Sequence, residues 1–305
     1  MKLRLLFLLL CSVTALGLPL SAQTSPVLTP PAAPLEGGPS ATPSPAPSTT
    51  ATPAPGPGPV NPYGPTTVVP ATLTNVGIPE IEDFYFQSTR GPGYSSLRQT
   101  PFLIKLTFDP RWQINVGGPG FMRANVPGGS PLEGGGGGWQ GGSLYGFGDP
   151  VVSLKYLIKT PDNAQQSTQA LQLSYKEPVT NPSLGFSSGR PDVQLTYFYS
   201  KDLGKLHIDV NFWLTDVGSP GGDPSRRLQF GDAAGLTIPL TSNLNYELEF
   251  HNYTGAAGVL PATFDNMHVF YWAIRPEFNL SFGVDLGLTK TTPKQTYILG
   301  TIFHL

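Results

Sequence analysis

Three titratable side chains alternate along one short stretch of the chain and could bind a metal ion. Glu247, Glu249 and His251 are separated by single residues, so on a β-strand all three would project from one face. Two carboxylates and an imidazole are ligands that divalent metals accept. Alternate residues of a strand lie about 7 Å apart, however, which is too wide for three ligands of one ion without a neighbouring strand. We therefore predict no metal and no cofactor.

The sequence gives no sign of an enzyme. A hydrolase would need a serine, a histidine and an acid or amide held together, and none of the four histidines lies next to a serine motif such as G-x-S-x-G. The glycine run at residues 132–143 lacks the Gly-Lys-Ser/Thr ending of a phosphate-binding loop. We predict that the chain has no catalytic residues.

The strands that carry these side chains can be read from the alternation of apolar and polar residues. From Leu206 to Thr215 every second residue is apolar, which is typical of a β-strand with one apolar and one polar face. No helical period of 3.6 competes with it. The same alternation recurs at 102–109, 112–116, 152–159, 171–176, 192–200, 244–251 and 278–289.

The connections between the strands alternate in length. Short joints stand at 109–111, 201–205, 239–243 and 275–277, with a longer one at 160–168. Longer Gly/Pro/Ser-rich loops stand at 90–100, 119–149, 178–191, 216–227, 253–265 and 289–295. With a first strand near 81–89, this pattern predicts an all-β fold, an up-and-down antiparallel transmembrane β-barrel of about twelve strands with short periplasmic turns and long external loops.

The apolar strand faces could instead fill the core of a soluble β-sandwich. Strand length favours the barrel, because spanning strands have about 9–11 residues and soluble strands about 5–6. Aromatic residues also stand near strand ends, as in an interfacial girdle: Trp112, Tyr156, Tyr175, Tyr197, Tyr199 and Phe278. The ending Gly300-x-x-Phe303-x-Leu305 resembles the signal read by the barrel-insertion machinery, with Leu in place of the usual Phe. We expect outer-membrane lipid around the barrel.

The polar strand faces would then line the lumen. A barrel of this size holds either a narrow pore or a plugged one. The predicted lumen-lining residues are Lys105, Lys155, Lys176, Asp192, Gln194, His207, Asp209, Asn211, Glu247, Glu249 and His251. The predicted entrance loop contributes Phe121 and Trp139, which could contact an aromatic solute.

The first 79 residues differ in composition from the barrel. Residues 1–22 have two early positive charges and a short apolar run, which predict a cleaved signal peptide and export to the outer membrane. The single cysteine, Cys11, lies inside this segment. Residues 23–79 are rich in Pro, Ala, Gly and Ser, which predicts a disordered leader, either an inert spacer or a tether that reaches peptidoglycan. Residues 80–305 form the predicted barrel.

The charge of the chain excludes some partners. Charged residues are 12% of the sequence and the net charge is -2, so we expect no nucleic-acid partner. The mean hydropathy of -0.07 excludes a bundle of membrane-spanning helices.

Three motifs in order resemble the bacterial family of meta-pathway phenol-degradation outer-membrane proteins. They are Gly146-Phe147-Gly148-Asp149 followed by VVSLKY, the stretch YSKDLGKLHIDVN from Tyr199 to Asn211, and VDLGLT from Val284 to Thr289. The resemblance covers roughly residues 100–305. It implies an outer-membrane barrel that passes small hydrophobic or aromatic compounds.

We therefore expect a passive channel or transporter for small solutes. Two alternatives stay open at this point. One is a non-conducting envelope anchor or adhesin that uses its long external loops, and the other is a soluble exported β-sandwich that binds a ligand.

Overall fold

The computed structural model describes residues 67–91, 94–126, 142–160, 166–181, 186–218, 226–254 and 262–305. The predicted signal peptide, residues 23–66 of the predicted leader, and Trp139 lie outside the described residues. No helix in the described ranges is long and apolar enough to cross a membrane.

One antiparallel sheet contains all fifteen strands of the described residues. They are β1 (Glu80–Gly91), β2 (Tyr94–Gln99), β3 (Phe102–Asp109), β4 (Trp112–Gly118), β5 (Phe121–Val126), β6 (Gly142–Phe147), β7 (Val151–Lys159), β8 (Thr168–Lys176), β9 (Asp192–Leu203), β10 (Leu206–Gly218), β11 (Arg226–Pro239), β12 (Leu244–Tyr253), β13 (Thr263–Arg275), β14 (Phe278–Gly287) and β15 (Gln295–His304).

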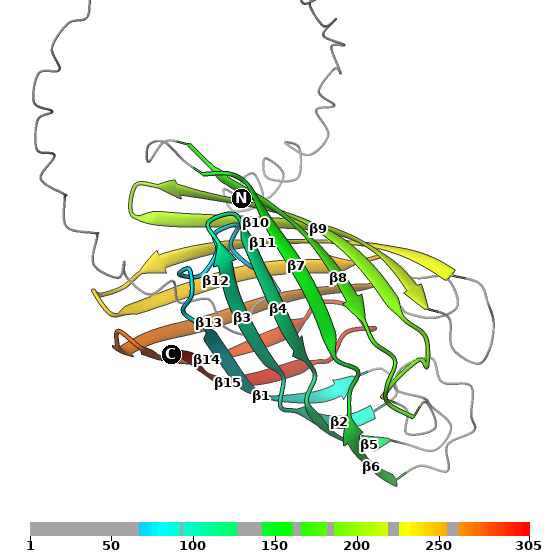
Figure 1. The fold of residues 1–305 in the computed structure, drawn as a ribbon. Coiled ribbons are helices and arrows are strands. Elements are labelled where there is room, and N and C mark those ends of the chain that lie inside the picture. The colour runs from blue at the N-terminus through cyan, green and yellow to red at the C-terminus, as the bar shows by residue number, and fades with distance from the viewer. Residues whose placement is uncertain are drawn as a thin grey trace, which may run out of the picture. The chain divides into compact units, whose positions relative to one another are not determined.

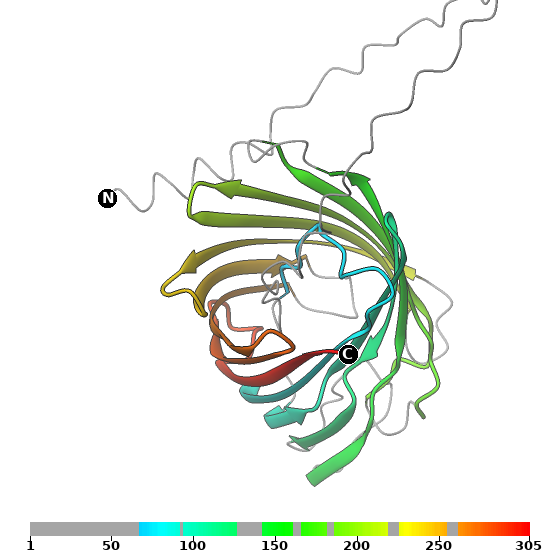
Figure 2. The same cartoon turned by 60° about the vertical axis from the view of Figure 1, so that its left-hand side comes forward.

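The sheet closes on itself. β1 pairs with β15 from Glu80 opposite His304 to Thr89 opposite Gln295, so the first and last strands meet. β2 and β3 are consecutive pieces of one long strand that is interrupted between them. The same holds for β4 and β5, and for β6 and β7. Counted in this way, the sheet is a closed antiparallel barrel of twelve strands, with β12 to β15 and β1 curving round to close the ring (Figures 1 and 2). The prediction of an all-β, roughly twelve-stranded barrel is confirmed.

The interruptions correct two of the predicted loops. β2 lies inside predicted loop 90–100, and β5 and β6 lie inside predicted loop 119–149. Pro101, Pro119 and Pro150 mark the breaks, because proline has no amide hydrogen to donate to a strand ladder. Gly120 sits at one break with a φ of 62°, and a Cβ there would lie 2.0 Å from the carbonyl oxygen of Thr100. Only glycine fits this position.

Large apolar side chains cover the outside of the barrel. On β8, Leu171, Leu173 and Tyr175 are exposed, whereas Ala170 and Ser174 on the other face are buried and Gln172 is half-buried. The same alternation holds along most of the strands, and aromatic pairs such as Trp112 with Tyr156 (4.5 Å between ring centroids) stand near the short turns. An exposed apolar face over a buried polar one is the pattern of a barrel whose outside meets lipid.

Buried ion pairs tie the closing strand to its neighbours. The ammonium of Lys105 on β3 contacts the carboxylates of Glu80, at 2.8 Å, and Glu82, both on β1. Glu80 also lies 3.3 Å from Nδ1 of His304 on β15. These charges therefore link three adjacent strands where the barrel closes.

We predict that a positive charge on the outer face destabilises the barrel in proportion to its depth. Leu173→Arg places a charge next to the outward-facing Leu154 and Leu195 and should cost about 2–4 kcal/mol in unfolding free energy. The matched Leu203→Arg, at a short turn, should cost about 0–1 kcal/mol. Urea unfolding in lipid vesicles measures both. Equal costs at the two positions would contradict a lipid-facing surface.

Candidate functional site in the lumen

Residues 67–79, here called the inner segment, run along the inner wall of the barrel. They fall within the range predicted as leader, and Figure 2 shows them as a blue-to-cyan trace inside the ring of strands. The segment leads into β1, and its last part is held to β3, where Gly77 N donates to Thr107 O at 2.8 Å. The backbone of the chain itself thus occupies part of the lumen.

The upstream end of the inner segment is bound by side chains of β12 and β10. The amides of Thr67 and Val68 donate to the two carboxylate oxygens of Glu249 at 3.2 and 2.9 Å. Asn211 accepts from Val69 N at 2.6 Å and donates to Val69 O at 2.8 Å, so the side-chain amide pairs with the backbone on both sides.

The middle of the inner segment is bound by β9, β7 and β4. Ala71 N donates to Ser200 Oγ at 2.6 Å. The ammonium of Lys155 donates to the carbonyl oxygens of Pro70 and Thr72, the latter at 3.1 Å. Thr74 N donates to Gln113 Oε1 at 2.9 Å. Buried polar side chains of the wall therefore use the inner segment as their hydrogen-bond partner.

Apolar contacts fix the same segment. Val68 packs with Trp213 and Ala233, and Ala71 packs with Leu157 and Phe198. Val68 fits because position 235 on β11 is a glycine. A Cβ at Gly235 would lie 2.6 Å from Cγ1 of Val68.

The predicted lumen-lining residues all project from the strand faces opposite the exposed apolar side chains. Those that contact the inner segment are Lys155, Asn211 and Glu249. Lys105 lies apart from these contacts, at the closing strands. Asp209 accepts a hydrogen bond from Ser200, which links it to the segment indirectly. Glu247 is buried beside Glu249 on the same face of β12.

The other predicted lumen-lining residues form pairs away from the inner segment. Lys176 contacts Asp192 at 2.7 Å near the long-loop end. Near the short-turn end, His207 lies between Asp202, 2.6 Å from Nδ1, and Asp209, 3.1 Å from Nε2. Gln194 donates to Thr196 at 3.0 Å, and His251 belongs to a cluster described below.

Phe121 does not face the lumen. It lies on the exposed side of β5, where its ring packs edge-on against Phe147 at 5.7 Å. The next residue, Met122, lies on the buried side of the same strand. A role for Phe121 at the entrance would therefore need a rearrangement of β5, and Trp139 is outside the described residues.

One part of the inner wall is apolar. Met267, Val269 and Tyr271 of β13 are buried with Ile298 of β15, and Phe86 of β1 packs against them. A second apolar cluster lies on the buried faces of β2 and β5 near the long loops. It consists of Leu97, Met122, Ala124, Val126 and Phe186, with Tyr94 and Leu144 packed against it. The lumen is thus divided into a polar wall that holds the inner segment and an apolar wall.

The wall beside the second apolar cluster is incomplete. β7, which continues β6, pairs with β8. In the described part of the chain β6 itself pairs with β5 and forms no ladder with β8. The segment after β8 is fastened across this place by Asp149, which accepts from Thr180 N at 2.9 Å and from Ser187 Oγ at 2.5 Å. The Gly-Phe-Gly-Asp motif therefore carries a structural anchor.

Ser187 belongs to a G-x-S-x-G match, Gly185-Phe186-Ser187-Ser188-Gly189, that the sequence reading overlooked. Its hydroxyl is buried and donates to Asp149. The described histidines lie in β10, β12, β13 and β15, whereas the hydroxyl of Ser187 contacts Asp149 and the amide of Gly189. The arrangement is that of a fastened loop.

Sequence reasoning missed the inner segment, the apolar wall, and Asp265 and Asp285 beside His251. A signal for the apolar wall exists in the run Met267 to Ile274, where both strand faces carry large apolar residues. A signal for the inner segment exists in Val68 and Val69, which interrupt the Pro-rich composition.

Comparisons with known proteins identify the fold. No family model matches the chain, and no curated protein matches its sequence. Among solved structures, an outer-membrane channel of Pseudomonas putida F1 is similar at 14% identity and a TM-score of 0.59, over 77% of this chain and 98% of that one. The KdgM porin is similar at 9% identity and a TM-score of 0.49, over 74% and 99% of the two chains.

The toluene transporter TbuX of Ralstonia pickettii is similar at 12% identity and a TM-score of 0.42, over 77% and 92% of the two chains. At these identities the likeness to the Pseudomonas putida channel establishes the fold, that of an outer-membrane β-barrel. The sequence resemblance to the phenol-degradation family stays a prediction.

We predict that Lys155→Met loosens the inner segment. The loss of a charged hydrogen bond to Pro70 O and Thr72 O should cost about 1.5–3 kcal/mol. The reporter is Ala71→Cys in the mature chain, which lacks Cys11. In the Lys155→Met background its thiol should react with a thiol reagent about 10- to 100-fold faster than in the background with Lys155. Lys159→Met, at the exposed end of β7, is the matched control. Unchanged labelling in Lys155→Met would contradict the role of this ammonium.

Proposed function

We propose that the chain is an outer-membrane channel for the passive movement of small solutes with apolar, and in particular aromatic, groups. The observation that carries the proposal is the apolar part of the inner wall. A water-filled porin lumen is polar, whereas here Met122, Val126, Met267 and Val269 project from inward faces. Such side chains favour a solute that leaves water readily.

The two parts of the wall have different roles in this proposal. The polar part is occupied by the inner segment, which limits the room for water and ions. The apolar clusters at β2, β5 and β13 are buried here, so in this proposal a solute contacts them by displacing the side chains packed over them. The resemblance of three sequence motifs to the phenol-degradation family supports the same solute class.

The incomplete wall beside β6 supports a sideways route. The cluster around Met122 lies next to the place where β6 has no ladder with β8. An apolar solute that binds this cluster is close to the lipid around the barrel. Loss of the hydrogen bonds that Thr180 and Ser187 donate to Asp149 would weaken this side of the wall.

The test compares solute uptake by vesicles that contain the purified protein. A phenolic acid, whose charge keeps leakage through lipid slow, should enter faster than a sugar of similar mass. Met122→Asn, which puts an amide on the inward face, should lower uptake of the phenolic acid. Phe121→Asn changes the neighbouring outward side chain and should leave uptake unchanged, which makes it the matched control.

Two results would contradict the proposal. Uptake equal to that of protein-free vesicles, from protein shown to be inserted, would leave a non-conducting anchor as the better account. Faster passage of the sugar than of the phenolic acid would indicate a general polar pore.

A further inference from the structure

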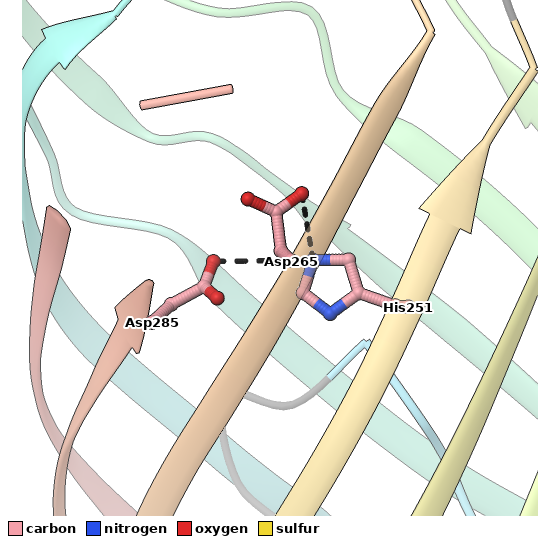
Figure 3. A group of neighbouring side chains, drawn as sticks. All are labelled: His251, Asp265 and Asp285. Atoms are coloured by element: carbon pink, nitrogen blue, oxygen red, sulfur yellow. Dashed lines mark ion pairs between the residues drawn. The ribbon is translucent and has the colours of Figure 1, made fainter. Parts of the chain in front are cut away.

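A buried cluster of one histidine and two aspartates lies on the inner wall toward the long loops. It consists of His251 on β12, Asp265 on β13 and Asp285 on β14, three strands that are adjacent in the sheet (Figure 3). The strand register brings them together, because His251 stands opposite Asp265 and Asp285 stands opposite Met267, two residues further along β13. Neighbouring strands thus supply the ligands that alternate residues of one strand cannot.

The distances in the cluster suit ligands of a common ion better than direct hydrogen bonds. Nε2 of His251 lies 3.6 Å from Oδ2 of Asp265 and 3.9 Å from Oδ2 of Asp285. Both separations are beyond hydrogen-bond length. One ligand atom from each residue lies within 4.8 Å of the others. Two ligands that each bind zinc at about 2.0–2.1 Å in tetrahedral geometry stand about 3.3 Å apart, so a small inward movement completes the set.

The burial of Asp265 supports cation binding independently of the cluster's shape. It is 5% exposed, and within the described part of the chain no hydrogen bond is donated to its carboxylate. Figure 3 shows this carboxylate turned toward the imidazole. A buried carboxylate without hydrogen bonds is costly unless a cation compensates it. Among the described residues, the side chain at ion-pair distance is His251, which is shared with Asp285.

The opposite side of the imidazole also faces a carboxylate. Oε1 of Glu249 lies 2.8 Å from Nδ1 of His251. A carboxylate on one ring nitrogen orients a histidine so that the other nitrogen faces a metal. Glu249 also accepts the amides of Thr67 and Val68, so its carboxylate is held in place by the inner segment.

We propose that His251, Asp265 and Asp285 bind a divalent transition-metal ion, for which zinc is the probe. One imidazole and two carboxylates favour zinc over calcium or magnesium, which take oxygen ligands. Three protein ligands leave a fourth position for water. The site adjoins Met267 of the apolar wall, but metal binding can be measured without any transport assay.

The experiment measures zinc bound to tag-free, detergent-folded full-length mature protein after chelator treatment. We expect one zinc ion per barrel in a competition titration. Asp265→Asn and His251→Gln should each weaken binding at least about 10-fold, and Glu249→Gln, which positions the imidazole, about 10- to 100-fold. His207→Gln is the matched control, because His207 also lies between two aspartates but has a carboxylate at each ring nitrogen.

Retained heat-dependent gel mobility shows that each variant is folded. Absence of stoichiometric zinc in the wild-type protein, or wild-type affinity in His251→Gln, would overturn the proposal. If the variants do not fold, X-ray absorption of the zinc-loaded wild-type protein identifies the ligands of the zinc ion. A shell that contains an imidazole nitrogen supports the site, and a shell of water oxygens alone overturns it.

Discussion

Charged groups buried inside a barrel must find partners, because burying an unpaired charge is costly. Some of them pair with one another, whereas Lys155 and Glu249 pair with the backbone of the inner segment. Lys155, Asn211 and Glu249 bind carbonyl oxygens and amides of residues 67–72, and Ser200 and Gln113 extend the same arrangement. The position of the inner segment, and through it the division of the lumen into two kinds of wall, follows from this pairing.

The pairing also explains features that lie far apart in the sequence. Gly235 on β11 leaves room for Val68, and Glu249 supports both the inner segment and the imidazole of His251. Met267, Val269 and Ile298 contribute apolar side chains to the wall formed by β13, β15 and β1. A solute with an aromatic ring can use that part, while the polar part keeps the chain's own backbone bound.

The sequence predicted the strands well where one face is uniformly apolar. The alternation from Leu206 to Thr215 identified the side chains that face inward on β10, because the side-chain period of a strand is fixed at two residues. It failed at β2, β5 and β6, where proline and glycine interrupt long strands and short pieces resemble loops. Local composition cannot show that the strand resumes as β5 after the break at Gly120.

The site was predicted in part for a similar reason. Lys155, Asn211 and Glu249 follow from periodicity, but their partner does not. Residues 67–79 were predicted to belong to the disordered leader 23–79, and the structure instead binds them to the barrel wall. Asp265 and Asp285 were missed because a metal-ligand set across three strands depends on register, which periodicity alone leaves open. Phe121 was assigned to an entrance loop because β5 was not recognised as a strand with an outward face.

The most direct test of this account is amide hydrogen exchange of the inner segment in the detergent-folded wild-type protein. The account predicts strong protection of Val68, Val69 and Ala71, whose amides donate to Glu249, Asn211 and Ser200. Exchange of these three amides at the rate of an unfolded peptide would contradict it. In that case the buried charges of the wall would have to be paired in some other way.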